Sequence, residues 1–331
     1  MTEAAAAIRL PWQEQQWLHL VELHQQNTLP HAILLAGPQG IGKQRFAEAF
    51  TQYLLCESPR QNVACGECRQ CGFIQAGSHP DLKWIAPEER GKQIKIDQVR
   101  ALVESLGHTA QQSGYKVVVL APAEAMNINA ANALLKSLEE PAAKTLLVLI
   151  SDAQSQLLPT IRSRCQVVGF PLPSMPIVKD WLATLAPAST SLELLYEEAA
   201  GQPMTALELL SDDGLERRQQ LMTDFSMLLS GRLSALALAE KWQQYDLRDI
   251  LYWLANKFSG LLARPYVAEE GEVAAGVAEL FKHMPLISAR NLFALLDQVT
   301  NLRVSLERGA NPNKLLALES LLLECCEKNH S

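Results

Sequence analysis

The residues best suited to chemistry form a glycine-rich loop that runs from Gly37 to Lys43 and reads Gly-Pro-Gln-Gly-Ile-Gly-Lys. It follows the short apolar run His31–Ala36, typical of a buried strand, and precedes a helical pattern from Gln44 to Leu55. In this context, backbone N–H groups at a helix N-terminus hold phosphate oxygens, and the lysine reaches the β- and γ-phosphates. The sequence therefore predicts a nucleotide-binding loop with the candidate contacts Gly37, Gly40, Gly42, Lys43 and Gln44.

The groups that such a loop needs for hydrolysis are missing. The residue after the lysine is normally Ser or Thr, whose hydroxyl binds Mg²⁺, and here it is Gln44. A second buried strand, Lys116–Leu120, should end in an acidic pair but is followed by Ala121-Pro122. Glu124 lies three residues beyond the acid position, and a displacement of about 1 Å already costs catalysis heavily. We therefore expect no intrinsic ATP hydrolysis. Two interpretations of the loop remain: it binds ATP or ADP without turnover, or it is a vestigial turn that binds nothing.

Four of the seven cysteines are clustered after the predicted loop helix, with the spacing C-x8-C-x2-C-x2-C: Cys56, Cys65, Cys68 and Cys71. Four thiolates at about 2.3 Å around a tetrahedral Zn²⁺ make a closed structural site without an open position for water. We predict a structural zinc module over residues 56–80 rather than free or redox-active thiols. His79 is a spare ligand candidate, and catalytic zinc is not expected.

An arginine further along the chain is suited to act on a nucleotide held by another subunit. Arg164 lies in Thr160–Cys165, just before a predicted strand. In P-loop proteins an arginine supplied in trans neutralises charge on the transferring γ-phosphate. A surface ion pair is the ordinary alternative, and Arg162 could fill the same role. Cys165 is expected to be a small buried residue, since no histidine is near it in sequence.

Apolar runs place these candidates in an α/β domain. Strands are predicted over residues 31–36, 81–85, 94–96, 116–120, 145–150 and 167–170. Asp97 is placed to cap a helix that ends near Leu106, and Asn127 or Asn129 to cap a second helix that Pro141 terminates. Alternation of strands and helices predicts a three-layer α/β fold with a parallel sheet.

The chain changes character at Pro171, after which no convincing strand follows. We predict an α/β domain over residues 1–170, a small helical lid over 171–213, and an all-α collar and oligomerisation domain over 214–331. Hydrophobic residues make up 48% of the 331 residues and charged residues 20%, which indicates a globular protein.

The bulk properties also restrict partners and location. A net charge of −7 argues against a protein that coats nucleic acid and favours protein partners. No apolar stretch approaches the roughly 20 residues that span a bilayer. The N-terminal residues lack the pattern of a signal peptide. We expect a cytoplasmic protein without a membrane partner.

Taken together, three segments resemble the clamp-loader branch of the AAA+ proteins. The segment Asn132–Pro141, which reads Asn-Ala-Leu-Leu-Lys-Ser-Leu-Glu-Glu-Pro, is similar to the central signature helix of that family. Ser163-Arg164-Cys165 matches its arginine-finger motif. The four cysteines lie where bacterial clamp-loader subunits carry a zinc module. The resemblance covers the whole chain and implies the α/β, lid and collar organisation.

The resemblance also implies partners and a role. The partners would be gamma/tau motor subunits, a delta subunit, and the sliding clamp and primed DNA reached through the assembled complex. Motor subunits carry Ser or Thr at position 44, an acidic pair at 121–122, and an arginine in the lid where this chain has Met204. Loss of all three with Arg164 retained implies a non-hydrolysing subunit of a DNA-directed DNA polymerase complex. The alternatives are an active motor subunit and a zinc-module DNA-binding protein.

Overall fold

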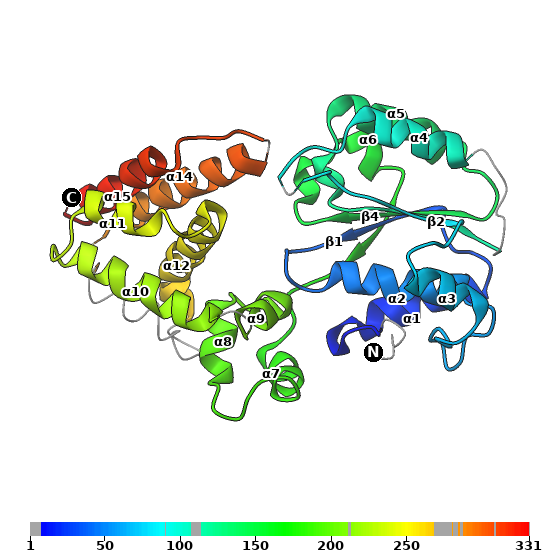
Figure 1. Ribbon diagram of the computed structural model, residues 1–331, viewed down its shortest axis with the longest axis horizontal. Coiled ribbons are helices and arrows are strands. Elements are labelled where there is room, and N and C mark those ends of the chain that lie inside the picture. Colours follow the sequence, from blue (N-terminus) through cyan, green and yellow to red (C-terminus); the bar gives the residue numbers. More distant parts are fainter. Residues whose placement is uncertain are drawn as a thin grey trace. The chain divides into compact units, whose positions relative to one another are not determined.

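The computed structural model describes residues 8–89, 91–106, 114–210, 213–267, 280, 284, 287–307 and 309–330. The chain divides into two compact units, Met1–Trp181 and Leu182–Ser331, which Figure 1 shows as a mixed α/β unit and a helical unit. The predicted boundary between lid and collar near residue 213 falls inside the second unit and stays a prediction.

The first unit is built on a five-stranded parallel sheet in the order β2-β3-β4-β1-β5. The three central strands are apolar and almost fully buried because helices cover both faces of the sheet. The strands are β1 (Ala32–Ala36), β2 (Leu82–Ile85), β3 (Lys116–Leu120), β4 (Thr145–Ser151) and β5 (Gln166–Gly169). The predicted parallel α/β fold is confirmed.

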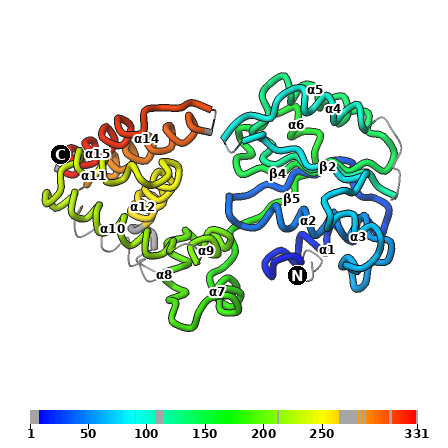
Figure 2. The backbone as a smooth tube through the Cα atoms, viewed as in Figure 1, coloured from blue at the N-terminus to red at the C-terminus, as the bar shows by residue number. Residues whose placement is uncertain are grey.

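Helices cover the sheet in two sets (Figure 1). One face carries α1 (Glu14–Gln25), α2 (Lys43–Leu55) and α3 (Arg69–Gln75). The other carries α4 (Ile96–Leu106), α5 (Ile128–Glu139) and the short α6 (Pro159–Arg162), with α4 and α5 side by side in Figure 2. Successive side chains of a strand point to opposite faces, so two separate cores form, one on each side of the sheet.

The start of α4 differs from the prediction. Residues 94–96 do not form a strand; Ile94 makes only an isolated bridge to Met126. The helix begins at Ile96, and the Gln98 side chain accepts a hydrogen bond from the Lys95 amide at 2.9 Å. The helical pattern that follows therefore determines the structure at Ile96, and the short apolar run does not form a strand. Asp97 lies in the first turn of α4 rather than at its N-cap. Asn127 does cap α5, accepting from the Ala130 amide.

In the second unit, the regular secondary structure of the described residues is all helical. It contains α8 (Leu192–Glu198), α9 (Pro203–Leu210), α10 (Gly214–Leu229), α11 (Ala235–Trp242), α12 (Leu247–Val267), α14 (Ala289–Glu307) and α15 (Lys314–His330), and α7 (Met175–Ala183) spans the boundary between the units. Its core includes Phe225, Trp242, Trp253 and Phe258, with Phe225 and Trp253 edge to face at 5.9 Å.

A buried ion pair joins two helices of this unit. The Nζ of Lys257 on α12 lies 2.7 Å from Oε1 of Glu198 on α8, and the two side chains are 7% and 5% exposed. Across the described part of the chain, no helix combines the length and apolar character needed to cross a membrane.

Candidate functional site

The glycine loop leaves the end of β1 and makes a tight turn into α2. Two glycines are required by the space around them. A Cβ on Gly37 would lie 2.1 Å from the Phe170 carbonyl oxygen, and one on Gly42 would lie 2.3 Å from the Leu10 side chain. Gly42 also has a φ of 86° and Gly40 one of 74°, which favour glycine. The predicted strand–loop–helix arrangement is therefore present.

Lys43 is directed into the protein rather than outward. Its side chain is 3% exposed. Its Nζ donates to the Gly37 and Pro38 carbonyls, each at 2.6 Å, and lies 2.6 Å from Oδ1 of Asp152. An ammonium group has three donors, and three acceptors surround this one. The strand register explains the meeting, since Ser151 at the end of β4 is level with Ala36 at the end of β1.

Two residues just before α1, Trp12 and Gln13, donate hydrogen bonds to backbone carbonyls of the glycine loop. Trp12 donates from Nε1 to the Ile41 carbonyl at 2.9 Å, and Gln13 donates from Nε2 to the Gly42 carbonyl at 2.9 Å. Gln13 is fully buried. Gln44 instead reaches Glu48 along the exposed side of α2 at 3.3 Å. The loop is thus stabilised by contacts within the chain.

The position of the missing acidic pair contains no metal-binding group. Ala121 and Pro122 follow β3. Glu124 has a structural role: its Oε1 accepts from the amides of Asp152 at 2.9 Å and Ala153 at 3.2 Å. Burial raises the pKa of the Glu124 carboxyl. The acid that the sequence offered as a substitute therefore holds the backbone beside Asp152, the partner of Lys43.

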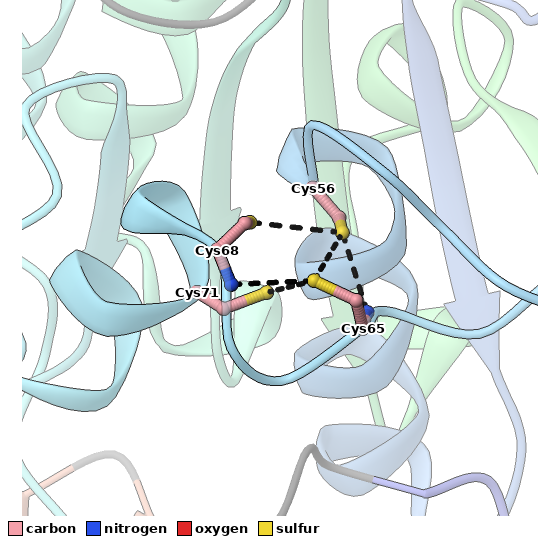
Figure 3. Close-up of side chains that lie close together, drawn as sticks. All are labelled: Cys56, Cys65, Cys68 and Cys71. Atoms are coloured by element: carbon pink, nitrogen blue, oxygen red, sulfur yellow. Dashed lines mark hydrogen bonds between the residues drawn. The ribbon is translucent and has the colours of Figure 1, made fainter.

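The four predicted zinc ligands come together (Figure 3). Within the described residues, the sulfurs of Cys56, Cys65, Cys68 and Cys71 all lie within 4.8 Å of one another. Three of the sulfur pairs are separated by 3.5 Å (Cys56 and Cys65), 3.9 Å (Cys56 and Cys68) and 4.0 Å (Cys65 and Cys71). Four sulfurs at 2.3 Å from a tetrahedral ion are separated by about 3.8 Å. The set therefore fits a zinc ion. His79 is outside it.

Local structure brings these sulfurs together and favours the thiolate form of one. Cys56 follows α2, Cys68 is the N-cap of α3, and Cys71 lies within α3. The Cys65 amide donates to the Cys56 sulfur and the Cys68 amide to the Cys65 sulfur, each at 3.3 Å. Backbone donors lower the pKa of Cys65 to about 6, whereas burial raises that of Cys71. Amide-to-sulfur hydrogen bonds suit thiolate ligands.

Arg164 lies in the turn between α6 and β5, and its side chain is 35% exposed. Its Nη1 donates to the Thr160 carbonyl at 3.0 Å and contacts the Ser163 hydroxyl at 3.4 Å. Its Nη2 lies 2.6 Å from Oε1 of Glu139, the last residue of α5. Arg162 is partly buried, and its Nε has no hydrogen-bond partner. Cys165 is buried, which raises its pKa to about 11, so it is not an activated nucleophile.

The two cations lie at opposite ends of the neighbouring parallel strands β1 and β5. Strand β5 runs parallel to β1, with Gln166 level with Ile33 and Gly169 level with Ala36. The glycine loop follows the carboxyl end of β1, whereas Arg164 precedes the amino end of β5. Three residue steps along β5 correspond to roughly 10 Å. Arg164 is therefore placed away from its own chain's phosphate loop.

Two acidic residues at these sites were not identified from the sequence. Asp152 approaches Lys43 only because β4 is the neighbour of β1. Glu139 approaches Arg164 because the end of α5 packs near α6. Asp152 directly follows a predicted strand, and functional groups collect at the carboxyl ends of parallel strands. The sequence therefore indicated that Asp152 lies at the carboxyl end of a strand, but it did not indicate that this strand is the neighbour of β1.

The sheet, the glycine loop and the helical second unit define the class: an α/β protein with a P-loop-like glycine loop, a helical second unit and a four-cysteine cluster. Two family models match the chain. One, described as DNA polymerase III, delta subunit, covers residues 12–174, and the other, described as DNA polymerase III, delta subunit, C terminal, covers residues 212–326.

Curated relatives place the chain within this class. DNA polymerase III subunit delta' of Pseudomonas aeruginosa is 41% identical, covering 95% of this chain and 96% of the relative. The Escherichia coli subunit of the same name is 33% identical, covering 95% and 94%. The chain belongs to the DNA polymerase III delta' subunit family. A solved structure of a gamma subunit-related protein from Thermotoga maritima is also similar, at 20% identity, with a TM-score of 0.46 and coverage of 94% of this chain and 99% of that one.

Proposed function

We propose that the chain is a non-hydrolysing subunit of the DNA polymerase III clamp loader. In this role it supplies Arg164 to ATP bound by a neighbouring gamma/tau motor subunit. Together with the delta subunit it helps to load the sliding clamp onto primed DNA. It contributes in this way to a DNA-directed DNA polymerase complex without turning over ATP itself.

The observation that carries this proposal is the contrast between Lys43 and Arg164. The Lys43 side chain is 3% exposed at the carboxyl end of β1, while the Arg164 side chain is 35% exposed before the amino end of β5. A guanidinium in that position is accessible to another subunit. Arginine suits the role because its planar fork matches phosphate oxygens.

The absence of intrinsic hydrolysis is supported by the groups around the glycine loop. Gln44 offers no hydroxyl, Ala121 and Pro122 offer no carboxylate, and Glu124 is engaged with backbone amides. Binding of ATP or ADP at Gly37, Gly40, Gly42, Lys43 and Gln44 would require Lys43 to exchange a present partner for a phosphate oxygen. We therefore expect any nucleotide binding to be weak and without turnover.

The four cysteines would hold a structural Zn²⁺ that stabilises the segment after α2. Such an ion would have no open coordination position, so it would take no part in ATP chemistry. We further propose that the chain acts in the cytoplasm and that it reaches the clamp and DNA only through the assembled complex. Its net charge of −7 is consistent with protein partners.

Reconstitution of the complex with motor subunits, delta and the clamp tests the role of Arg164. We expect Arg164→Ala to depress DNA-stimulated ATP hydrolysis and clamp loading, because arginine fingers contribute on the order of 10³–10⁵ in rate in other P-loop systems. The loss in total turnover will be smaller, since the other sites continue to hydrolyse ATP. Arg164→Lys should not restore activity, because an ammonium lacks the bidentate fork.

Arg162→Ala is the matched control, since it removes the same type of side chain two residues away. We expect it to leave hydrolysis unchanged. If Arg162→Ala is the damaging change, the assigned arginine is wrong. If neither substitution matters while the complex assembles normally, the proposal of an arginine acting in trans fails.

A further inference from the structure

The candidate finger is not a free side chain. Arg164 contacts three groups of its own chain: the Glu139 carboxylate at 2.6 Å, the Thr160 carbonyl at 3.0 Å and the Ser163 hydroxyl at 3.4 Å. Two of these come from the same turn. Glu139 comes from a different element, the end of α5, which lies more than twenty residues earlier in the chain.

Glu139 is in an electrostatically unfavourable place for an acid. It is the last residue of α5, where the helix dipole disfavours negative charge. Glu140, the next residue, is exposed and carries the same charge. The Arg164 guanidinium offsets the cost for Glu139. Because both partners are about one-third to one-half exposed, at 35% and 51%, such a pair contributes little to folding stability. Its main effect is on the orientation of the arginine.

We propose that Glu139 is a positioning residue for Arg164, a proposal that rests on the trans role proposed above. An arginine side chain has many rotamers, and restricting them before the neighbour's nucleotide arrives removes an entropic cost of reaching the transition state. The carboxylate of Glu139 and the carbonyl of Thr160 fix the plane of the guanidinium from two directions.

The Glu139 carboxylate also has an opposing effect, because its negative charge repels the phosphate that Arg164 would approach. At a half-exposed pair, solvent and salt screen that repulsion. Misplacement of a catalytic group by 1 Å, by contrast, costs about 10²-fold in rate. Orientation is therefore the larger effect, and removal of Glu139 should slow the neighbour's reaction.

The test is ATP hydrolysis by the reconstituted complex containing Glu139→Ala, with Glu140→Ala as the control. Both substitutions remove one negative charge from the same end of α5. The quantity to compare is the Arg164-dependent share of hydrolysis, which is the difference between wild type and Arg164→Ala. We expect Glu139→Ala to reduce this share at least about tenfold through kcat, with the KM for ATP unchanged. Glu140→Ala should leave it intact.

Two further measurements separate positioning from a structural role. The thermal unfolding midpoints of the isolated Glu139→Ala and Glu140→Ala chains should agree with each other. In the Arg164→Ala background, Glu139→Ala should have no additional effect, because the group that it positions is gone.

Each other outcome overturns the proposal. If Arg164→Ala itself has no effect, the trans role fails and positioning fails with it. If Arg164→Ala slows hydrolysis but Glu139→Ala does not, the trans role stands and positioning is wrong. An increase in rate with Glu139→Ala would show that Glu139 restrains the finger. Equal losses with Glu139→Ala and Glu140→Ala would show a general charge effect.

Discussion

Lys43 and Arg164 are both residues that the sequence connects with nucleotide phosphates, and both have partners within their own chain, yet they differ in how far their side chains are exposed. Lys43 is 3% exposed and has three oxygen partners within its own chain, each at 2.6 Å. The Arg164 side chain is 35% exposed before the amino end of β5, beside the half-exposed Glu139. A motif identifies the type of residue, whereas the exposure of the side chain determines whether its charge is accessible from outside the chain.

This difference gives a general expectation for the charged and thiol groups of the chain. Groups satisfied inside the chain should affect stability when they are changed and have little effect on a neighbour's reaction. Groups directed outward should do the reverse.

The largest stability effect is expected at the four cysteines. We predict one Zn²⁺ per chain, and its removal should open the segment over residues 56–80, because the ion cross-links three short pieces of backbone. Elemental analysis of Cys71→Ser and limited proteolysis of that segment would measure this. Cys326→Ser is the control, since it removes a partly buried thiol from the helical unit. Protein purified without chelator that contains no stoichiometric zinc would refute the prediction.

A smaller loss is expected when the buried ion pair of the helical unit is broken. Lys257→Met leaves the Glu198 carboxylate, which is 5% exposed, without its cation. Breaking such a pair costs about 3–5 kcal/mol, and urea unfolding would measure it. Lys95→Met, which removes the cation of the exposed pair with Glu88, should cost far less. Comparable losses in the two variants would contradict the distinction between inward and outward groups.

The smallest effect concerns the pH dependence of stability at Glu124. Burial raises the folded-state pKa of its carboxyl above the ordinary value of 4.5, so the folded state binds this proton more tightly. The stability from Glu124 is therefore greatest at low pH and is lost as the pH rises through the raised pKa. Glu124→Gln keeps an acceptor for the Asp152 amide and removes the titration.

We expect Glu124→Gln to become more stable relative to wild type, with a larger free energy of unfolding, as the pH rises from about 4 to about 7. Urea unfolding across this range would measure it. A constant difference between the two proteins would mean that the buried carboxyl has an ordinary pKa.

The fold could be predicted to the extent that it depends on local patterns. The apolar runs of β1, β3 and β4 indicated buried parallel strands, and Asn127 was one of two expected caps of α5. The grouping of the four cysteines followed from their spacing. The prediction for residues 94–96 was wrong because three residues carry too little periodicity to distinguish a strand from the approach to a helix.

The partners of the two cations could not be predicted, because they depend on packing between distant segments. Asp152 meets Lys43 only if β4 lies beside β1, and the sequence does not specify strand order. Glu139 meets Arg164 only if the end of α5 reaches the turn before β5. The sequence therefore indicated the two candidate residues but not the acid that each of them contacts.

We propose that this chain serves a neighbour's ATP through Arg164 and not through its own phosphate loop. The most direct measurement compares ATP hydrolysis by two reconstituted complexes, one with Lys43→Met and one with Arg164→Ala in this subunit, each first shown to fold and assemble. Our expectation is that Lys43→Met lowers the stability of the subunit but leaves hydrolysis near wild type, while Arg164→Ala reduces hydrolysis without loss of stability. Loss of hydrolysis with Lys43→Met, and none with Arg164→Ala, would contradict it.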